Sequence, residues 1–208
     1  MNKMLDKIIL AADDFLFTCF AHTQHTPLPT QENNHQPTEK TAREHTAGLM
    51  RINHVGEVCA QGLYGGAKFF AQSHTTYQFL HQAQKDELTH LSWCNIRLSQ
   101  LNGRPSYLIP FYYAASFAMG AGAGVISDPF SLGFVVETEK QVEEHLKTHI
   151  QDLSPSDTMT HETLKKMQED ESGHAEHAIH LGAYPLSPLI KTLMRQCANL
   201  MKKISYHL

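Results

Sequence analysis

The sequence is poor in cysteine and carries little excess charge, and both shortages exclude classes of protein. Its 208 residues include four cysteines, which form no Cys-x-x-Cys pair and fall in helical patterns, so a disulfide framework is not expected. A formal net charge of −4 gives no indication of a nucleic acid or another polyanionic partner. The apolar stretch near the N-terminus is interrupted by Asp6, Asp13 and Asp14, which argues against a signal peptide. These absences favour a soluble protein of a reducing cytosol.

Strand patterns and dinucleotide or flavin motifs are also lacking, and helical periodicity fills most of the chain. Helices are predicted over residues 39–72, 76–101, 108–127, 130–153, 156–181 and 186–206, with glycine and proline at the breaks. Residues 23–37 are rich in Thr, Gln, Asn, His and Pro and have almost nothing to bury. The sequence therefore predicts an all-α protein, with an N-terminal amphipathic helix (1–22), a flexible linker (23–38) and one helical domain (39–208).

One short element occurs twice in these helices. It is Glu87-Leu88-Thr89-His90 and again Glu171-Ser172-Gly173-His174, each directly after an aspartate, Asp86 or Asp170. Residues three apart share a helix face, so each element offers one carboxylate and one imidazole to the same point. A di-metal helix bundle combines two such elements with one glutamate from each of two further helices. The repeat predicts a two-metal carboxylate site.

The two further glutamates follow from helix geometry. In an antiparallel hairpin, two side chains lie level when they are equally far from the turn, because both helices rise about 1.5 Å per residue. Glu57 and Glu87 are centred beside the polar run 73–76, and Glu139 and Glu171 are centred on Pro155. We expect a helix to begin at this proline, with Ser154 as its N-cap. The ligand order is the same in both hairpins, which indicates an internal pseudo-repeat.

Several acidic residues and histidines near these positions have other interpretations. Glu137 lies nearly opposite Glu139 on the same helix. Glu143, one turn from Glu139, is either a supporting group or a solvated charge. His177 and His180 continue the His174 face and are interpreted as packing or surface residues. Asp86 and Asp170 are either surface charges or the carboxylates that accept the second ring N–H of metal-bound histidines.

The predicted ligand set indicates which metal it would hold. Four carboxylates and two imidazoles without a thiolate suit iron or manganese, whereas structural zinc favours cysteine. Iron is the first choice, because two Fe(II) ions with open positions can reduce dioxygen together.

The segment from Tyr107 to Ile126 contains no charged residue and is apolar almost all round. Its length approaches that of a membrane span, but a crossover helix between two hairpins would also be apolar, and we expect burial in the protein. The run Gly120-x-Gly122-x-Gly124 indicates close helix packing, since no strand precedes it as in a nucleotide loop. Such a helix could shape a pocket for a hydrophobic substrate and touch a bilayer surface.

Four segments together carry a family resemblance from about Arg43 onward. They are Arg51-Ile52-Asn53-His54-Val55-Gly56-Glu57-Val58-Cys59-Ala60-Gln61, Asp86-Glu87-Leu88-Thr89-His90, Val136-Glu137-Thr138-Glu139 with Gln141-Val142-Glu143 and His145, and Asp170-Glu171-x-x-His174. In this order they resemble the demethoxyubiquinone hydroxylases. These are di-iron monooxygenases of ubiquinone biosynthesis that act on 2-polyprenyl-3-methyl-6-methoxy-1,4-benzoquinol.

The resemblance implies a ferritin-like fold and a set of functional residues. Its six iron ligands fall on Glu57, Glu87, His90, Glu139, Glu171 and His174, the same six that the helix geometry selects. His145 matches a catalytic histidine that passes electrons or protons.

The resemblance also implies the reaction partners and the location. They are two iron ions per subunit, O2 and NADH as co-substrates, and peripheral attachment to the cytoplasmic side of the cell membrane. Electrons from NADH would be relayed through the quinone ring. The resemblance is compatible with a homo-oligomer or with partners in a biosynthetic complex. It implies no nucleic-acid partner. A ferritin-like iron store and a non-catalytic assembly protein are the alternatives.

Overall fold

The computed structural model describes residues 3–20, 26–29 and 39–208, and over these residues the chain is helical and contains no strand. The helices are α1 Lys3–Phe20, α2 Lys40–Phe70, α3 His74–Gln100, α4 Ile109–Ile126, α5 Asp128–Asp152, α6 Thr158–His180 and α7 Pro188–Ser205. This confirms the predicted all-α class, and the helices after the linker begin and end within about two residues of the predicted bounds.

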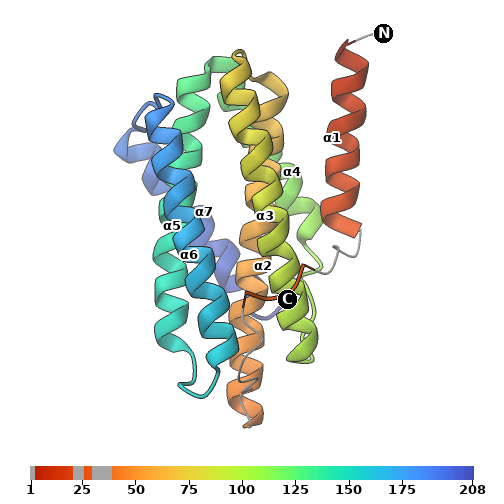
Figure 1. Cartoon of the computed structure of the whole chain (residues 1–208), viewed down its shortest axis with the longest axis vertical. Helices are drawn as coiled ribbons and strands as arrows, with labels where there is room; N and C mark the ends of the chain where they lie inside the picture. The colour runs from red at the N-terminus through yellow and green to blue at the C-terminus, as the bar shows by residue number, and fades with distance from the viewer. Residues whose placement is uncertain (1–2, 21–25, 30–38) are drawn as a thin grey trace.

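Two helical hairpins form the centre of the bundle. Helices α2 and α3 pack together, as do α5 and α6, and α4 connects the two hairpins along the chain. Figure 1 shows these four helices along the long axis, with α1 to one side and with α4 and α7 behind. This is the predicted arrangement of two hairpins and a crossover helix.

Two apolar clusters fill the interior of the four central helices. One contains Met50, Trp93, Leu146 and Met167, and the other contains Leu63, Leu80, Leu132 and Ala178. On each helix, the predicted ligands lie between the residues of the first cluster and those of the second. The polar layer is therefore closed above and below by packed hydrocarbon, and its helix positions are set by burial of the apolar residues on either side.

The start of α6 differs from the prediction. The N-cap is Asp157, and not Ser154, because the Asp157 carboxylate accepts a hydrogen bond from the Thr160 N–H at 3.1 Å. The same carboxylate lies 3.1 Å from the Arg97 guanidinium, and both side chains are fully buried. This pair between α3 and α6 lies at the start of α6, which begins at Thr158, three residues after Pro155 and two after the predicted bound of 156.

Helix α4 is buried on one face only. Glycines let it approach α2 closely: a Cβ added at Gly66 would lie 2.1 Å from the Phe117 carbonyl oxygen, and one at Gly120 would lie 2.1 Å from that of Leu63. The interpretation of the glycine run as close packing is confirmed for Gly120. It is wrong for Gly122, where a Cβ would meet nothing within 4 Å.

The expectation that this helix is buried holds only for its α2 face. Phe111, Met119, Val125 and Ile126 are exposed, and 39% of the helix is buried. The reason is that α4 packs mainly on α2 and lies outside the four-helix core. By length and composition alone, it is also the one helix of the described residues that could cross a membrane.

Part of the predicted linker is described, and it contacts α3. The Thr26 N–H donates to Ser92 Oγ at 3.3 Å, and the Trp93 indole donates to the Pro27 carbonyl at 2.9 Å. Leu28 packs against the cluster that contains Trp93. Residues 21–25 and 30–38, and with them both predicted boundaries of this linker, lie outside the described residues.

Candidate metal centre

The four predicted glutamates meet at one level of the bundle, each from a different helix. Glu57 lies on α2, Glu87 on α3, Glu139 on α5 and Glu171 on α6, and none is more than 2% exposed. His90 joins them from α3 and is also buried, whereas His174 joins from α6 and is half-buried. The structure thus brings all six predicted side chains into one layer.

These six side chains divide into two groups of four. The first contains Glu57, Glu87, His90 and Glu171, and the second contains Glu87, Glu139, Glu171 and His174. Within each group, one donor atom of every residue lies within 4.8 Å of the others. Glu87 and Glu171 belong to both groups, so the arrangement suits two neighbouring cations that share two carboxylates.

Both imidazoles point Nδ1 toward the carboxylates. His90 Nδ1 lies 3.1 Å from Glu87 Oε2 and 3.4 Å from Glu171 Oε1, and His174 Nδ1 lies 3.0 Å from Glu87 Oε1. Since one ring nitrogen of each histidine faces the carboxylate oxygens, Nδ1 is the atom available to a cation. The opposite nitrogen, Nε2, is left for another partner.

That partner is an aspartate of the other Asp-Glu-x-x-His element. His90 Nε2, from α3, lies 3.2 Å from Asp170 on α6, and His174 Nε2, from α6, lies 3.4 Å from Asp86 on α3. Asp170 also accepts a hydrogen bond from Lys166 at 2.6 Å. The interpretation of both aspartates as supports for the histidines agrees with this geometry, and the pairing is crossed between the helices. Each ring orientation therefore depends on both helices.

Burial and neighbouring charges shift the pKa values of the carboxyl groups in this layer. Burial, with Glu87 and Glu171 nearby, raises the pKa of Glu57 well above its usual range, and burial with Glu171 nearby does the same to the pKa of Glu139. Burial alone would also raise the pKa of Glu87, but the adjacent His90 and His174 hold it well below its usual range. Four carboxylates at one water-poor level need nearby positive charge.

Hydrogen bonding in the layer is also incomplete. Neither oxygen of Glu171 forms a hydrogen bond, nor does Glu139 Oε2, although all three atoms are buried. Buried carboxylate oxygens are normally paired, so converging unpaired ones are the expected sign of cation ligands. The oxygen and nitrogen donor set, without a thiolate, fits iron or manganese. The residues present therefore fit the two implied metal ions.

A tyrosine that was not predicted from the sequence completes the layer. The Tyr64 hydroxyl donates a hydrogen bond to Glu139 Oε1, and its side chain is fully buried. Tyr64 follows Glu57 by seven residues, or about two helical turns, so it lies on the same face of α2. That spacing is the signal that could have found it.

The remaining candidates lie outside both groups of ligands. Glu137 is buried on the opposite side of α5 and pairs with Lys191 on α7 at 3.2 Å. Glu143 is half-buried and belongs to neither group, while His177 and His180 are exposed. These positions agree with the interpretations of the sequence.

An apolar cavity of about 960 Å³ lies beside the ligand layer, between α2, α4, α5 and α7. Apolar side chains form most of its wall, among them Leu108, Phe111, Met119, Leu193, Met194 and Leu200. Two lining residues, Gly56 and Thr138, directly precede the ligands Glu57 and Glu139. The cavity therefore lies next to the predicted ligand layer, on the side of α2 and α5, and its volume suits a sizeable apolar ligand.

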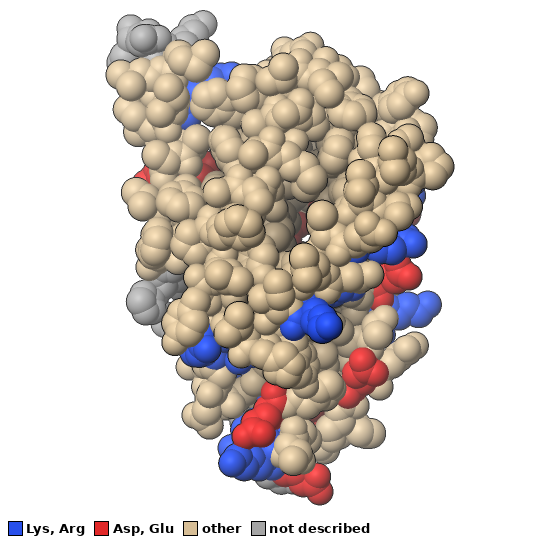
Figure 2. Space-filling model, turned by 180° about the vertical axis from the view of Figure 1, so that it is seen from behind, with Lys and Arg blue, Asp and Glu red and all other residues tan. Residues whose placement is uncertain are grey.

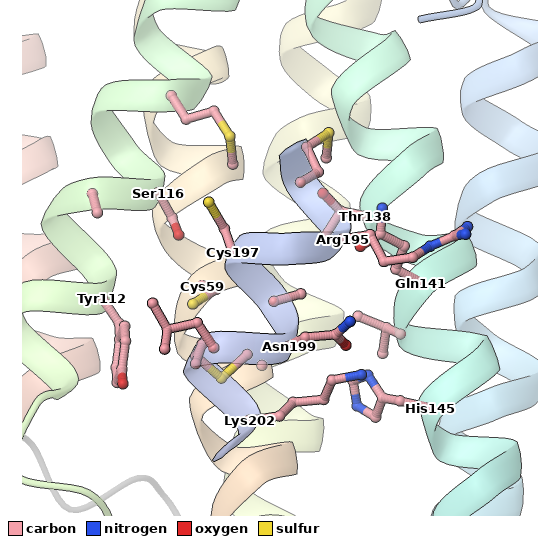
Figure 3. A pocket seen from close by; sticks show the side chains of 18 of the residues that line it. Cys59, Tyr112, Ser116, Thr138, Gln141, His145, Arg195, Cys197, Asn199 and Lys202 are labelled. Atoms are coloured by element: carbon pink, nitrogen blue, oxygen red, sulfur yellow. The ribbon is translucent and has the colours of Figure 1, made fainter. Parts of the chain in front are cut away.

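His145 is in the wall of this cavity and not in the ligand groups. Figure 3 shows it on α5, with Thr138 and Gln141 on the same helix, Cys59 and Ser116 on the other side, and Lys202 on α7. Burial holds the pKa of His145 well below its usual range, so the ring is neutral. One ring N–H donates a hydrogen bond to the Gln141 backbone carbonyl, and Nε2 has no partner.

Comparison with known proteins gives a consistent result. The model of the family described as Ubiquinone biosynthesis protein COQ7 matches residues 44–205. A 3-demethoxyubiquinol 3-hydroxylase of Psychrobacter arcticus is 45% identical, over 98% of this chain and 96% of the relative. The protein of the same name from Xanthomonas campestris pv. campestris is 44% identical, over 99% of this chain and 95% of the relative.

Proposed function

The chain belongs to the COQ7 family of ubiquinone biosynthesis proteins, and on that basis we propose that it is a di-iron monooxygenase that hydroxylates a polyprenyl methoxy-benzoquinol. One observation carries the proposal: six side chains from four helices form two groups of metal donors that share Glu87 and Glu171. An apolar cavity large enough for a quinol ring and the start of its tail adjoins them.

The six side chains would divide between two iron ions. Glu57 and His90 would bind one, Glu139 and His174 the other, and Glu87 and Glu171 would lie between them. Bound iron would supply the activation of O2. The crossed aspartates keep each imidazole turned with Nδ1 inward, and the Tyr64 hydroxyl holds one oxygen of Glu139 in place.

The cavity would orient the quinol. The ring would lie at the end lined by Gly56 and Thr138, where its C–H bond is nearest the ligand layer. The neutral His145 has an unpaired Nε2 in the same wall and would accept a hydrogen bond from a quinol hydroxyl there, which would orient the ring. In balance, one oxygen atom of O2 enters the C–H bond, the other leaves as water, and the two additional electrons come from NADH through the quinone ring.

The prenyl tail determines where such an enzyme works. The cavity is bounded by α4 and α7, and Figure 2 shows that the face seen from behind is largely uncharged in its upper part. Helix α7 exposes Leu189, Leu193 and Leu200 and carries three lysines and one arginine, as an interfacial helix does. We place the protein peripherally on the cytoplasmic side of the cell membrane, with the tail leaving between α4 and α7.

The test is a mass-spectrometric profile of lipid quinones in cells that lack the gene, complemented with the wild-type chain, with Glu171→Ala or with Glu162→Ala. Glu162 is exposed on the same helix as Glu171 and serves as the control. Accumulation of a quinone without one oxygen substituent, reversed by the wild type and by Glu162→Ala but not by Glu171→Ala, is the expected result. Normal ubiquinone in cells without the gene would refute the substrate assignment.

A further inference from the structure

A second cavity opens at the ligand layer, on the side of α3 and α6. It has a volume of about 360 Å³, and its lining includes Asp86, His90, Glu169, Asp170, Gly173 and His174. No residue of α4 or α7 lines it, whereas both helices line the apolar cavity. Two of the six predicted ligands, His90 and His174, line this polar cavity, whereas the apolar cavity is lined by the neighbours Gly56 and Thr138 and by none of the six.

We propose that divalent metal ions enter and leave the site through this polar cleft between α3 and α6, and not through the apolar cavity. The inference rests on the proposed function, since it requires that the six side chains bind metal. It concerns the route of the ion, which the assignment of the ligands does not determine.

Charge favours the cleft over the apolar cavity. The lining of the cleft includes three carboxylates, of which Asp170 contacts Lys166 and His90, and Asp86 contacts His174. The charged residues of the apolar cavity are Glu144, Arg195 and Lys202. A mouth with an excess of negative charge concentrates cations, and one with an excess of positive charge repels them.

The inner end of the cleft leads directly to the donors. His90 and His174 line it, and their Nδ1 atoms face the buried carboxylates. Glu171 is 1% exposed, has no hydrogen bond to either oxygen, and lies 3.4 Å from His90 Nδ1. An ion that passes the imidazoles therefore meets a buried carboxylate that faces both histidines and forms no hydrogen bond.

The crossed pairs close this route when they form. His90 with Asp170, and His174 with Asp86, each join α3 to α6 across the cleft, at 3.2 Å and 3.4 Å. These two helices contact each other far less than either contacts its hairpin partner. Rotation of an imidazole away from its aspartate would open the path without moving the hairpins.

Gly173 allows the route to be blocked selectively. It is exposed in the lining of the cleft, and a Cβ added there would meet nothing within 4 Å. Gly173→Leu would place a side chain over the mouth and leave all six donors in place. Gly122→Leu is the matched control, because Gly122 is also an exposed helical glycine with open space, on α4.

The experiment measures iron exchange on the full chain. Purified metal-free protein is mixed with Fe(II) without oxygen, and uptake is followed by competition with a coloured chelator; release from the loaded protein is followed with excess chelator. Gly173→Leu should slow both rates by about tenfold or more, equivalent to a barrier about 1.4 kcal/mol higher, with the final iron content unchanged. Glu169→Gln should slow uptake and weaken its dependence on salt, whereas Glu162→Gln should do neither.

Ala198→Phe tests the alternative route through the apolar cavity, because Ala198 lines that cavity. Slower exchange in Ala198→Phe with wild-type rates in Gly173→Leu would overturn the proposal, as would equal rates in all variants that bind two iron ions. If the wild type binds no iron at all, the proposed function fails and the route with it. Normal iron content with an unchanged Gly173→Leu rate refutes the route alone.

Discussion

Glu87 and Glu171 differ from the other predicted ligands because each belongs to both groups of possible metal donors. Glu57 belongs to one position only. Replacing a shared carboxylate removes a donor from both ions, and replacing an unshared one removes it from a single ion. The number of iron ions that a variant binds per chain therefore distinguishes a shared ligand from an unshared one.

We predict that Glu57→Ala retains about one iron ion per chain and that Glu171→Ala retains almost none, after dialysis at limiting Fe(II). The measurement is iron content by elemental mass spectrometry, with circular dichroism to verify the helical fold. Glu143→Ala is the control, since Glu143 belongs to neither group. Equal losses in Glu57→Ala and Glu171→Ala would contradict the shared position of Glu171.

A buried histidine near the cavity predicts how stability depends on pH. Burial lowers the pKa of His149 from 6.5 to about 4, and its Nδ1 lies 2.7 Å from Asn53 Oδ1. Between these two pKa values the unfolded chain binds a proton that the folded chain does not. The contribution of His149 is therefore full above pH 6.5 and decreases as the pH falls toward 4.

We predict that His149→Gln makes the free energy of unfolding less dependent on pH in this window, by up to about 1.4 kcal/mol per pH unit. Glutamine keeps an amide donor for Asn53 and has no proton to gain. Urea unfolding at pH 7 and at pH 5.5 measures the difference. An unchanged pH slope in the variant would show that His149 does not remain neutral in the folded protein.

At the scale of the elements, most helix ends could be predicted because glycine, proline and polar runs act locally. The start of α6 could not be predicted in this way. Its N-cap, Asp157, also forms a buried ion pair with Arg97, which is sixty residues away in the sequence. The half-buried state of α4 could not be predicted either. An apolar helix has the same composition whether protein covers all of it or one face only.

The contact between α2 and α4 leads to a prediction at this scale. Gly120→Ala would place a Cβ 2.1 Å from the Leu63 carbonyl oxygen, so we expect it to lower the free energy of unfolding by about 1–3 kcal/mol. Gly122→Ala has open space and should raise the same quantity by about 0.5–1 kcal/mol, because alanine favours a helix. Urea unfolding of both variants measures this; changes of the same sign would refute the close contact.

At the scale of the whole molecule, the ligand layer separates two apolar clusters, so its charge affects the stability of the entire bundle. Four carboxylates at this level are at most 2% exposed. Metal ions that bind the folded chain and not the unfolded chain would offset their repulsion and add binding free energy to folding.

We predict that Fe(II) at about a thousand times its dissociation constant stabilises the chain by roughly 4 kcal/mol. For a chain of this size, the expected rise in Tm is roughly 10 °C. Scanning calorimetry without oxygen, with Fe(II) or with a chelator, measures it. Glu171→Ala should show a much smaller rise, and an identical Tm for the wild type in both conditions would argue against metal in this layer.

The sequence by itself determined the helical class, the two hairpins and the six side chains that share one layer. Helix rise and the three-residue face relation act over short distances, so spacing alone brings Glu57 level with Glu87 and Glu139 level with Glu171. Only the tertiary structure decided which aspartate contacts which histidine, that Tyr64 donates a hydrogen bond to Glu139, and that two cavities lie beside the layer on different sides. Those features depend on how helices distant in the sequence pack together, and no local pattern specifies that packing.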